Sequence, residues 1–289
     1  MENASTILSC PVCGQPLERD GSSLRCAGNH CYDIARAGYV NLLLSNQSAG
    51  HRHGDDRKML DARTAFLEKG FYAPVSDAIN DLAAAHIESI GSGIIADCGC
   101  GDGWYTYRLL DRMAGCGARP RTLCVDISRD ALRLAARRNT PGRGYDVTCA
   151  VASAYRLPLA AASCGLLMSV FAPIAAEEFA RVLADDGLLL TAVPLERHLF
   201  GLKSAVYDTP YENPHEDGEL PGFTLSERRS LEYDITLTGE EARQLFMMTP
   251  YYYKTSREDQ QKLETVDELK TEVAIEVRIY SKTKQCRTK

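Results

Sequence analysis

A short glycine-rich stretch carries the clearest chemical signal in this chain of 289 residues. The apolar run Ile94–Ala96 leads into Asp97, and glycines then follow at alternate positions, Gly99, Gly101 and Gly103. An apolar run that ends in glycines is typical of a buried parallel strand that turns sharply into a helix. Glycine permits the unusual backbone angles of such a turn and lets a ligand approach the backbone closely. The free N–H groups at the start of the following helix would face the same crevice, so the stretch predicts a ligand site.

The spacing of the glycines indicates which ligand binds there. A dinucleotide fingerprint is G-x-G-x-x-G, whereas this loop is D-x-G-x-G-D-G, with Asp102 between the last two glycines. The loop resembles motif I of class I S-adenosylmethionine (SAM) dependent methyltransferases, in which it wraps the methionine half of the cofactor. A second apolar run, Thr122–Asp126, ends in a carboxylate that could accept both ribose hydroxyls, and this resemblance places Ser153 near the adenine. The alternative is a glycine-rich turn with a solvated aspartate after each strand.

The first forty residues contain a second set of chemically suited side chains. Cys10 and Cys13 form a C-x2-C pair, and a gap of twelve residues separates them from Cys26 and His30, a C-x3-H pair. Two close pairs of soft ligands suit tetrahedral Zn²⁺, with the gap closing a hairpin. Cys31 could replace His30 as the fourth ligand, although its spacing makes it the poorer choice. Four protein ligands make a closed site, so we expect a structural zinc that takes no part in catalysis.

Composition limits the partners and the compartment. With 45% hydrophobic residues, the chain can bury roughly three quarters of its unfolded surface, which fits one large domain and a small appendage. The formal charge of −6 shows no overall basic character, so any nucleic-acid surface must be local. The first nine residues do not resemble a signal peptide, so we expect a cytoplasmic protein with reduced or metal-bound cysteines and no membrane span. The sequence leaves open whether the chain forms a homodimer.

Apolar periodicity predicts the elements that position these residues. A polar linker is expected at residues 45–57, and two helices between Asp56 and Glu88 are separated by a break at Lys69–Pro74. Seven apolar runs are then expected as strands: one from Ile94, then Thr122–Asp126, Val147–Ala152, Gly165–Val170, Gly187–Val193, Leu231–Leu237 and Val273–Ile279. Their alternation with helices predicts an α/β fold, a Rossmann-like class I methyltransferase with a seven-stranded sheet. We place this domain at residues 45–289, behind a zinc-binding domain at residues 1–44.

The segment after the fourth of these strands bears on the acceptor of the methyl group. Enzymes that methylate exocyclic amino groups usually carry Asn/Asp-Pro-Pro-aromatic there, whereas this chain has Phe171–Pro173. C5 methylation of pyrimidines needs a cysteine nucleophile, which the segment Met168–Ile174 lacks. The acceptors that remain are a ring nitrogen, an oxygen or a small molecule. Phe171 could stack on an extruded base, as aromatic side chains commonly do in RNA recognition.

A set of short motifs spread over nearly the whole chain resembles the RlmA-type 23S rRNA (guanine-N1)-methyltransferases. Besides the cysteine–histidine finger and motif I, the matching motifs are Gly38–Leu42, Lys69–Pro74, Ala152–Pro158, Phe171–Pro173, Arg197–Leu199, Gly222–Thr224 and Met248–Pro250. The resemblance implies transfer of the SAM methyl group to N1 of one guanine in a hairpin loop of 23S rRNA. That loop lies near the macrolide-binding exit tunnel, and some relatives confer macrolide resistance. It also implies that Tyr72, Gly101, Asp102 and His198 contact SAM and that the zinc module binds the rRNA.

The sequence does not identify the residue that acts as the general base. N1 of neutral guanine carries a proton that must leave, so a base within hydrogen-bonding reach is expected. Asp102 and His198 are the two candidates near the crevice. Two other functions remain as alternatives: a SAM-dependent methyltransferase of a small molecule with a structural zinc finger, and a non-catalytic RNA- or protein-binding module.

Overall fold

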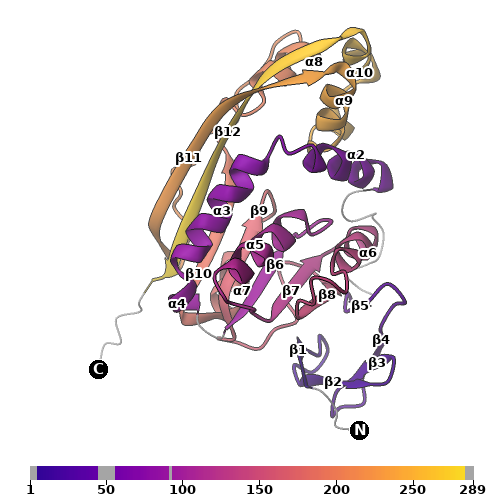
Figure 1. The fold of residues 1–289 in the computed structure, drawn as a ribbon, viewed down its shortest axis with the longest axis vertical. Coiled ribbons are helices and arrows are strands. Elements are labelled where there is room, and N and C mark those ends of the chain that lie inside the picture. Colours follow the sequence, from indigo (N-terminus) through magenta and orange to yellow (C-terminus); the bar gives the residue numbers. More distant parts are fainter. Residues whose placement is uncertain (1–4, 45–55, 91–92, 284–289) are drawn as a thin grey trace.

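The computed structural model describes residues 5–44, 56–90 and 93–283, and its largest element is a mixed sheet (Figure 1). The predicted linker at residues 45–57 therefore lies outside the described residues, except for its last two positions. The strands of the large sheet, in spatial order, are β11 (Phe223–Thr238), β12 (Glu268–Lys282), β10 (Leu183–Pro194), β9 (Cys164–Val170), β6 (Ile94–Cys98), β7 (Thr122–Asp126), β8 (Val147–Val151) and β5 (Tyr39–Asn41).

The strands from β10 to β5 are all parallel, and β12 runs antiparallel to both of its neighbours. Parallel strands need apolar side chains on both faces because helices cover both faces. All seven residues of β9 are buried, as are the last four of β6. The chain adds β7 and β8 on one side of β6 and then β9 on the other side. Open α/β sheets bind their ligands where the strand order reverses in this way. The seven expected strands and the α/β fold of a class I methyltransferase are confirmed.

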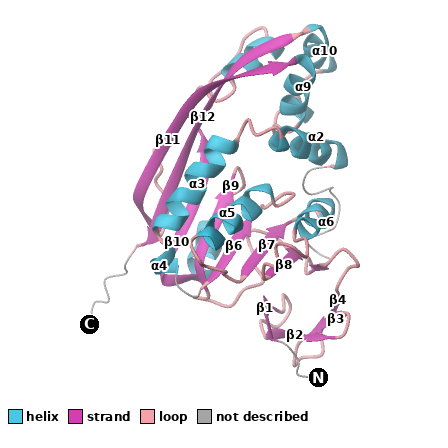
Figure 2. Ribbon diagram, in the orientation of Figure 1, coloured by secondary structure: helices cyan, strands magenta, loops and turns pink. Residues whose placement is uncertain are grey.

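The large sheet has an eighth strand that the sequence pattern did not predict. Tyr39–Asn41 pairs in parallel with Cys149–Val151 of β8, so the N-terminal segment extends the sheet at its edge. The preceding residues form a separate four-stranded antiparallel sheet, which Figure 2 shows apart from the large one. Its strands are β1 (Ser5–Ser9), β2 (Pro16–Asp20), β3 (Ser23–Arg25) and β4 (Cys31–Asp33). Within this module, β2 and β3 form the hairpin between the two ligand pairs.

Helices cover the large sheet and frame its carboxyl edge (Figure 1). They are α2 (Arg57–Glu68), α3 (Ala73–Ala85), α4 (Ile87–Ile90), α5 (Trp104–Gly115), α6 (Arg129–Arg138), α7 (Ala176–Val182), α8 (Phe200–Val206), α9 (Gly239–Met247) and α10 (Arg257–Gln261), with 3₁₀ turns η1 (Tyr252–Lys254) and η2 (Lys262–Thr265). Side chains of α3, α5, α8 and α9 share one core with the sheet. Those of α7 share a second core with the N-terminal module.

Local signals fix where several of these helices begin. The Ser128 side chain accepts a hydrogen bond from the Ala131 N–H and caps α6, and Thr238 with Glu241 forms a reciprocal capping box at the start of α9. Pro74 lies in the first turn of α3, where its missing N–H costs no helical hydrogen bond. Among the described residues, no helix is both long and apolar enough to cross a membrane.

Candidate functional site

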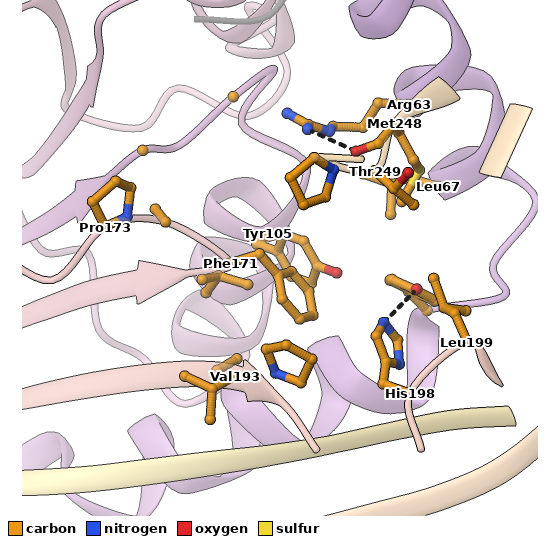
Figure 3. Close-up of a pocket in the computed structure, with 18 of the residues that line it drawn as sticks. Arg63, Leu67, Tyr105, Phe171, Pro173, Val193, His198, Leu199, Met248 and Thr249 are labelled. Carbon is orange, nitrogen blue, oxygen red and sulfur yellow. Dashed lines mark hydrogen bonds between the residues drawn. The ribbon is translucent and has the colours of Figure 1, made fainter. Parts of the chain in front are cut away.

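A cavity of about 550 Å³ opens at the carboxyl edge of the sheet, between the glycine loop and the helices above it. Its wall combines the loop after β6, the segments after β9 and β10, helix α2, and the region around the end of α9. Figure 3 shows Tyr105, Phe171 and His198 around this space, with Arg63 and Met248 at its border. Of the residues expected at the site, the structure brings six to this wall: Tyr72, Gly99, Gly101, Asp102, Phe171 and His198.

The glycine loop has the conformation that its sequence predicts. Gly99, Gly101 and Gly103 all have positive φ, at 79°, 56° and 78°. At Gly99 no side chain fits, since a Cβ there would lie 2.4 Å from the Ala172 Cβ. Gly101 is different, because its nearest neighbour would be the Arg63 Nη1 at 3.6 Å and its backbone borders the cavity. The second glycine thus leaves open space where a ligand can approach the backbone.

Asp126 and Ser153 lie at neighbouring strand ends but outside the wall of the cavity. One carboxylate oxygen of Asp126 accepts a hydrogen bond from the Gly101 N–H at 2.9 Å, and the other accepts from the Ser128 N–H at 2.8 Å. Asp126 therefore holds the glycine loop in place in addition to any ribose contact. Ser153 follows β8, and Ala152 donates its N–H to the Asp126 carbonyl at 3.2 Å.

Asp102 is buried, and both of its carboxylate oxygens accept hydrogen bonds from the protein. One of its carboxylate oxygens accepts from the Trp104 N–H at 3.1 Å, and the other accepts from the Thr64 hydroxyl and from the Arg138 guanidinium. Arg138 also donates to the Asp102 carbonyl at 2.8 Å. A carboxylate so paired stabilises the loop, but it has little capacity left to accept a substrate proton.

His198 is a buried, neutral imidazole. Burial lowers its pKa to about 3, and the positive charge of Lys203 acts in the same direction. Its Nδ1 accepts a hydrogen bond from the Ala274 N–H at 3.3 Å, so the ring proton lies on Nε2. Nε2 then donates to the Tyr72 hydroxyl at 3.3 Å, as Figure 3 shows by a dashed line. This arrangement suits a positioning residue better than a base, because the nitrogen nearest the cavity already carries a proton.

Phe171 has a conformation that core packing does not explain. Its φ is +53°, a region that bulky residues rarely adopt, yet 42% of the residue is exposed. The ring lies 6.3 Å from Tyr105 and 6.1 Å from Tyr72, measured between ring centroids. Strain at an exposed aromatic residue beside a cavity indicates a functional surface, and this one offers a flat apolar face.

Asp97 supports the loop from beneath and does not reach the cavity. It is 1% exposed, and the Thr106 hydroxyl donates to its carboxyl group at 2.5 Å. Burial raises the pKa of this carboxyl group to about 8, and the nearby Cys124 acts in the same direction. Asp97 is therefore largely protonated in the folded chain near neutral pH.

This burial makes the stability of the ligand-free protein depend on pH. Between pH 4 and pH 8 the folded chain keeps a proton on Asp97 that the unfolded chain releases, so stability should fall as the pH rises. Asp97→Asn removes that titration and should flatten the decline by about 1.4 kcal/mol per pH unit in this window. Urea unfolding of the wild type and the variant at pH 5, 6.5 and 8 measures their free energies of unfolding. A difference between the two proteins that does not change with pH would contradict the titration of Asp97.

Several residues of the wall carried no signal in the sequence. Asn213 and Glu216 belong to the polar segment 208–222, and Tyr251 follows α9. Asn213 is fixed by its neighbours, because its amide donates to the Leu195 carbonyl and accepts from Lys203. Only a tertiary fold brings this loop to the glycine loop, so neither periodicity nor spacing could identify these residues.

The expected metal ligands gather at one point of the N-terminal module. The ligand atoms of Cys10, Cys13, Cys26 and His30 all lie within 4.8 Å of one another. The sulfurs of Cys13 and Cys26 are 3.6 Å apart, and His30 Nδ1 lies 3.3 Å from the Cys26 sulfur and 3.6 Å from that of Cys10. A tetrahedral ion with Zn–S bonds of about 2.3 Å requires sulfur separations of about 3.7 Å, so the set fits zinc.

The surroundings of the cluster also suit a metal. Tyr32 hydrogen-bonds to the Cys10 sulfur at 3.3 Å. Burial raises the pKa of the Cys10 thiol, but hydrogen bonds from Tyr32 and the neighbouring backbone outweigh it and lower the pKa to about 6. This favours the thiolate that binds zinc. Cys31 is exposed on β4 and outside the set, which leaves His30 in the fourth position.

Comparison with known families identifies both parts of the chain. The zinc-ribbon family described as "RlmA, N-terminal" matches residues 8–48, and the family described as "Methyltransferase domain" matches residues 95–187. The first match contains the metal cluster, and the second contains the glycine loop with the strands β6 to β9. A protein of Bacillus subtilis (strain 168) with the provisional name 23S rRNA (guanine-N(1)-)-methyltransferase YxjB is 27% identical over 88% of this chain and 89% of its own.

Two further curated relatives are more similar in sequence. A protein of Micromonospora griseorubida, with the provisional name 23S rRNA (guanine-N(1)-)-methyltransferase, is 39% identical over 68% of each chain. The 23S rRNA (guanine(748)-N(1))-methyltransferase of Streptomyces fradiae is 32% identical over 71% of this chain and 69% of its own. The protein is therefore a SAM-dependent methyltransferase with an N-terminal zinc ribbon, and it belongs to the family of the 23S rRNA (guanine-N1)-methyltransferases.

Proposed function

We propose that this enzyme transfers the methyl group of SAM to N1 of a guanine in a hairpin loop of 23S rRNA. Membership of the family supports the substrate class, and the strained, exposed ring of Phe171 beside the cavity is the structural observation that carries the proposal. A base turned out of a loop can stack on this ring next to the reacting methyl group. The absence of an amide at this position favours a ring nitrogen over an exocyclic amine. The proposal includes a loop near the macrolide-binding exit tunnel, as the resemblance of the sequence implies.

Residues in the wall of the cavity and beside it offer polar groups and backbone to each part of the cofactor. Gly99 and Gly101 would border the methionine half of SAM, and Tyr72 and His198 are part of the same wall. Asp126 would accept hydrogen bonds from the ribose while it holds the Gly101 N–H, and Ser153 would lie toward the adenine. SAM supplies an electrophilic methyl group, so the protein mainly positions the reactants and excludes water.

The N-terminal module would serve as the RNA-binding part, with zinc held by Cys10, Cys13, Cys26 and His30. Its metal set is closed, so the ion would stabilise the fold of the module and leave the chemistry to the cavity. The division at residue 44 stays a prediction, and the pairing of β5 with β8 ties the end of the module to the large sheet. Ser9 also donates its N–H to the Pro158 carbonyl at 2.9 Å, so the module is joined to the loop that follows β8.

The product of the reaction tests this function directly. A methyl group on N1 replaces the hydrogen-bond donor of the Watson–Crick edge, so reverse transcriptase should stop one nucleotide before the modified guanine. We expect one strong stop in a 23S rRNA loop after incubation of unmodified rRNA with the protein and SAM. Nucleoside mass spectrometry of that region should give 1-methylguanosine. Phe171→Ala should reduce the yield at limiting enzyme at least tenfold through loss of stacking.

Other methylated products would contradict the proposed acceptor or the proposed substrate. A methylated adenosine, cytidine or ribose would keep the methyltransferase activity and overturn the proposed acceptor. Labelled methyl groups found only in a small metabolite would support the alternative of a small-molecule methyltransferase. A parallel reaction without protein and one with S-adenosylhomocysteine in place of SAM serve as controls.

A further inference from the structure

Among the described residues, one carboxylate in the wall of the cavity accepts no hydrogen bond from the protein. Among the described residues of its wall, Asp102, His198 and Glu216 are the carboxylate and imidazole groups. The oxygens of Asp102 accept from a backbone N–H, a hydroxyl and a guanidinium, and His198 carries its proton on the nitrogen that faces Tyr72. Both groups suggested by the sequence are thus committed to other partners. Glu216 is the candidate that remains.

Glu216 is held at the cavity by Arg278 of β12. The Arg278 guanidinium is only 4% exposed, and it donates to the Glu216 carbonyl at 2.8 Å. Another of its nitrogens lies 3.7 Å from the Glu216 carboxylate, an ion pair beyond hydrogen-bonding distance. Three residues earlier, the Asn213 N–H donates to the Glu196 carbonyl at 2.8 Å. The loop is therefore fixed at two points, while the Glu216 side chain stays 56% exposed and able to accept hydrogen bonds.

Several charged side chains lie around Glu216, on its own loop and on the neighbouring strands. Arg278 is paired with the buried Glu276 on its own strand, and Arg228 of β11 lies 3.9 Å from that same carboxylate. Within the loop, Asp217 follows directly, and the preceding His215 pairs with Glu196. Arg278 thus places a buried positive charge beside Glu216 that it shares with Glu276.

We propose that Glu216 is the general base of the reaction, a deepening that rests on the proposed function. The edge of guanine presents the N1–H and an amino N–H side by side, and an ionised carboxylate offers two acceptor oxygens to match them. The N1–H bond breaks and its proton passes to a Glu216 oxygen. The electron pair on N1 forms the new bond to the methyl carbon, and the bond from that carbon to the sulfur of SAM breaks. The products are 1-methylguanine, neutral S-adenosylhomocysteine and protonated Glu216, so atoms and charge balance.

Glu216→Gln in the full-length chain tests this assignment. With saturating SAM and 23S rRNA, single-turnover methyl transfer at pH 7 should fall by about 10²- to 10⁴-fold. The SAM affinity, measured by calorimetric titration, should stay within about twofold because the loop remains anchored, and it also shows that the variant is folded. The deficit should shrink as the pH rises toward the range in which N1 of guanine ionises without help.

Glu219→Gln is the matched control, since Glu219 is an exposed acid of the same loop that does not border the cavity. It should react at the wild-type rate across the pH range. A Glu216→Gln enzyme as fast as this control would overturn the assignment. The assignment would also be overturned by a lower methyl-transfer rate that is constant with pH and recovers at high rRNA concentration. Such a result would identify Glu216 as an RNA contact. A wild-type enzyme that forms no 1-methylguanosine overturns the proposed function itself, and with it the base.

Discussion

Gly101→Val is expected to weaken SAM binding at least 100-fold, the largest loss of cofactor affinity that we anticipate from one substitution in the cavity. Gly101 has a φ of +56°, which a β-branched residue adopts only with strain, and its backbone borders the cavity. Its N–H donates to Asp126, so any shift of this residue also disturbs the expected ribose site. A valine side chain would occupy space that the cofactor needs. Calorimetric titration of the purified variant with SAM measures the effect.

Gly117→Val separates the two contributions to this loss. Gly117 has a φ of +82° in a turn after α5, and a Cβ there would meet no atom within 4 Å. The substitution therefore brings similar backbone strain without an obstruction in the cavity. We expect Gly117→Val to bind SAM normally, even if it melts at a lower temperature. Equal losses in both variants would show that strain alone explains the Gly101 result, and unchanged affinity in Gly101→Val would remove the support for this loop as the cofactor site.

The fold could be predicted wherever an element has a local signal. The strands from β6 to β10 and the helices α2, α3 and α6 follow from apolar periodicity and from caps such as Ser128. Two features have no such signal. Tyr39–Asn41 is too short to show a period, and its strand conformation depends on pairing with β8. Most residues in the first half of β11 after Phe223 are exposed, and pairing with β12 forms the strand there.

The candidate site could be predicted only in part, for the same physical reason. The glycine loop and the zinc ligands depend on spacing within a few residues, which the sequence displays directly. The roles of Asp102 and His198 depend on partners that are distant in sequence, Arg138 in α6 and Ala274 in β12. These contacts favour positioning roles for both residues, and their part in the reaction stays a prediction. Glu216 reaches the cavity through Arg278, which lies 62 residues later, so no local pattern could identify it.

Removal of the zinc is the second change with a large expected effect. A module of this size has little core of its own, and zinc in such modules contributes about 10–16 kcal/mol to folding. Cys10→Ser deletes one of the four ligands and should leave the purified protein with far less than one zinc per chain. Elemental analysis measures the metal, and limited proteolysis should cut the N-terminal segment much faster than in the wild type.

Cys10→Ser should impair the methylation of rRNA and leave SAM binding nearly unchanged. The residues of the cavity all come from position 63 onward, so Cys10→Ser should bind SAM with an affinity within a fewfold of wild type. Methylation of 23S rRNA should fall at least tenfold, because the proposed RNA-binding module loses its structure. Loss of SAM binding would instead show that the module supports the sheet through the core that it shares with Leu123 and Leu159.

Cys31→Ser is the control that decides the fourth ligand. Cys31 is exposed next to His30, yet it lies outside the set of ligand atoms that fits a tetrahedral ion. We expect Cys31→Ser to keep one zinc per chain and normal rRNA methylation, and His30→Ala to lose both. The reverse result would place the Cys31 thiolate on the metal. Full zinc content in Cys10→Ser, or disulfide bonds among these cysteines in the native protein, would contradict the zinc site as a whole.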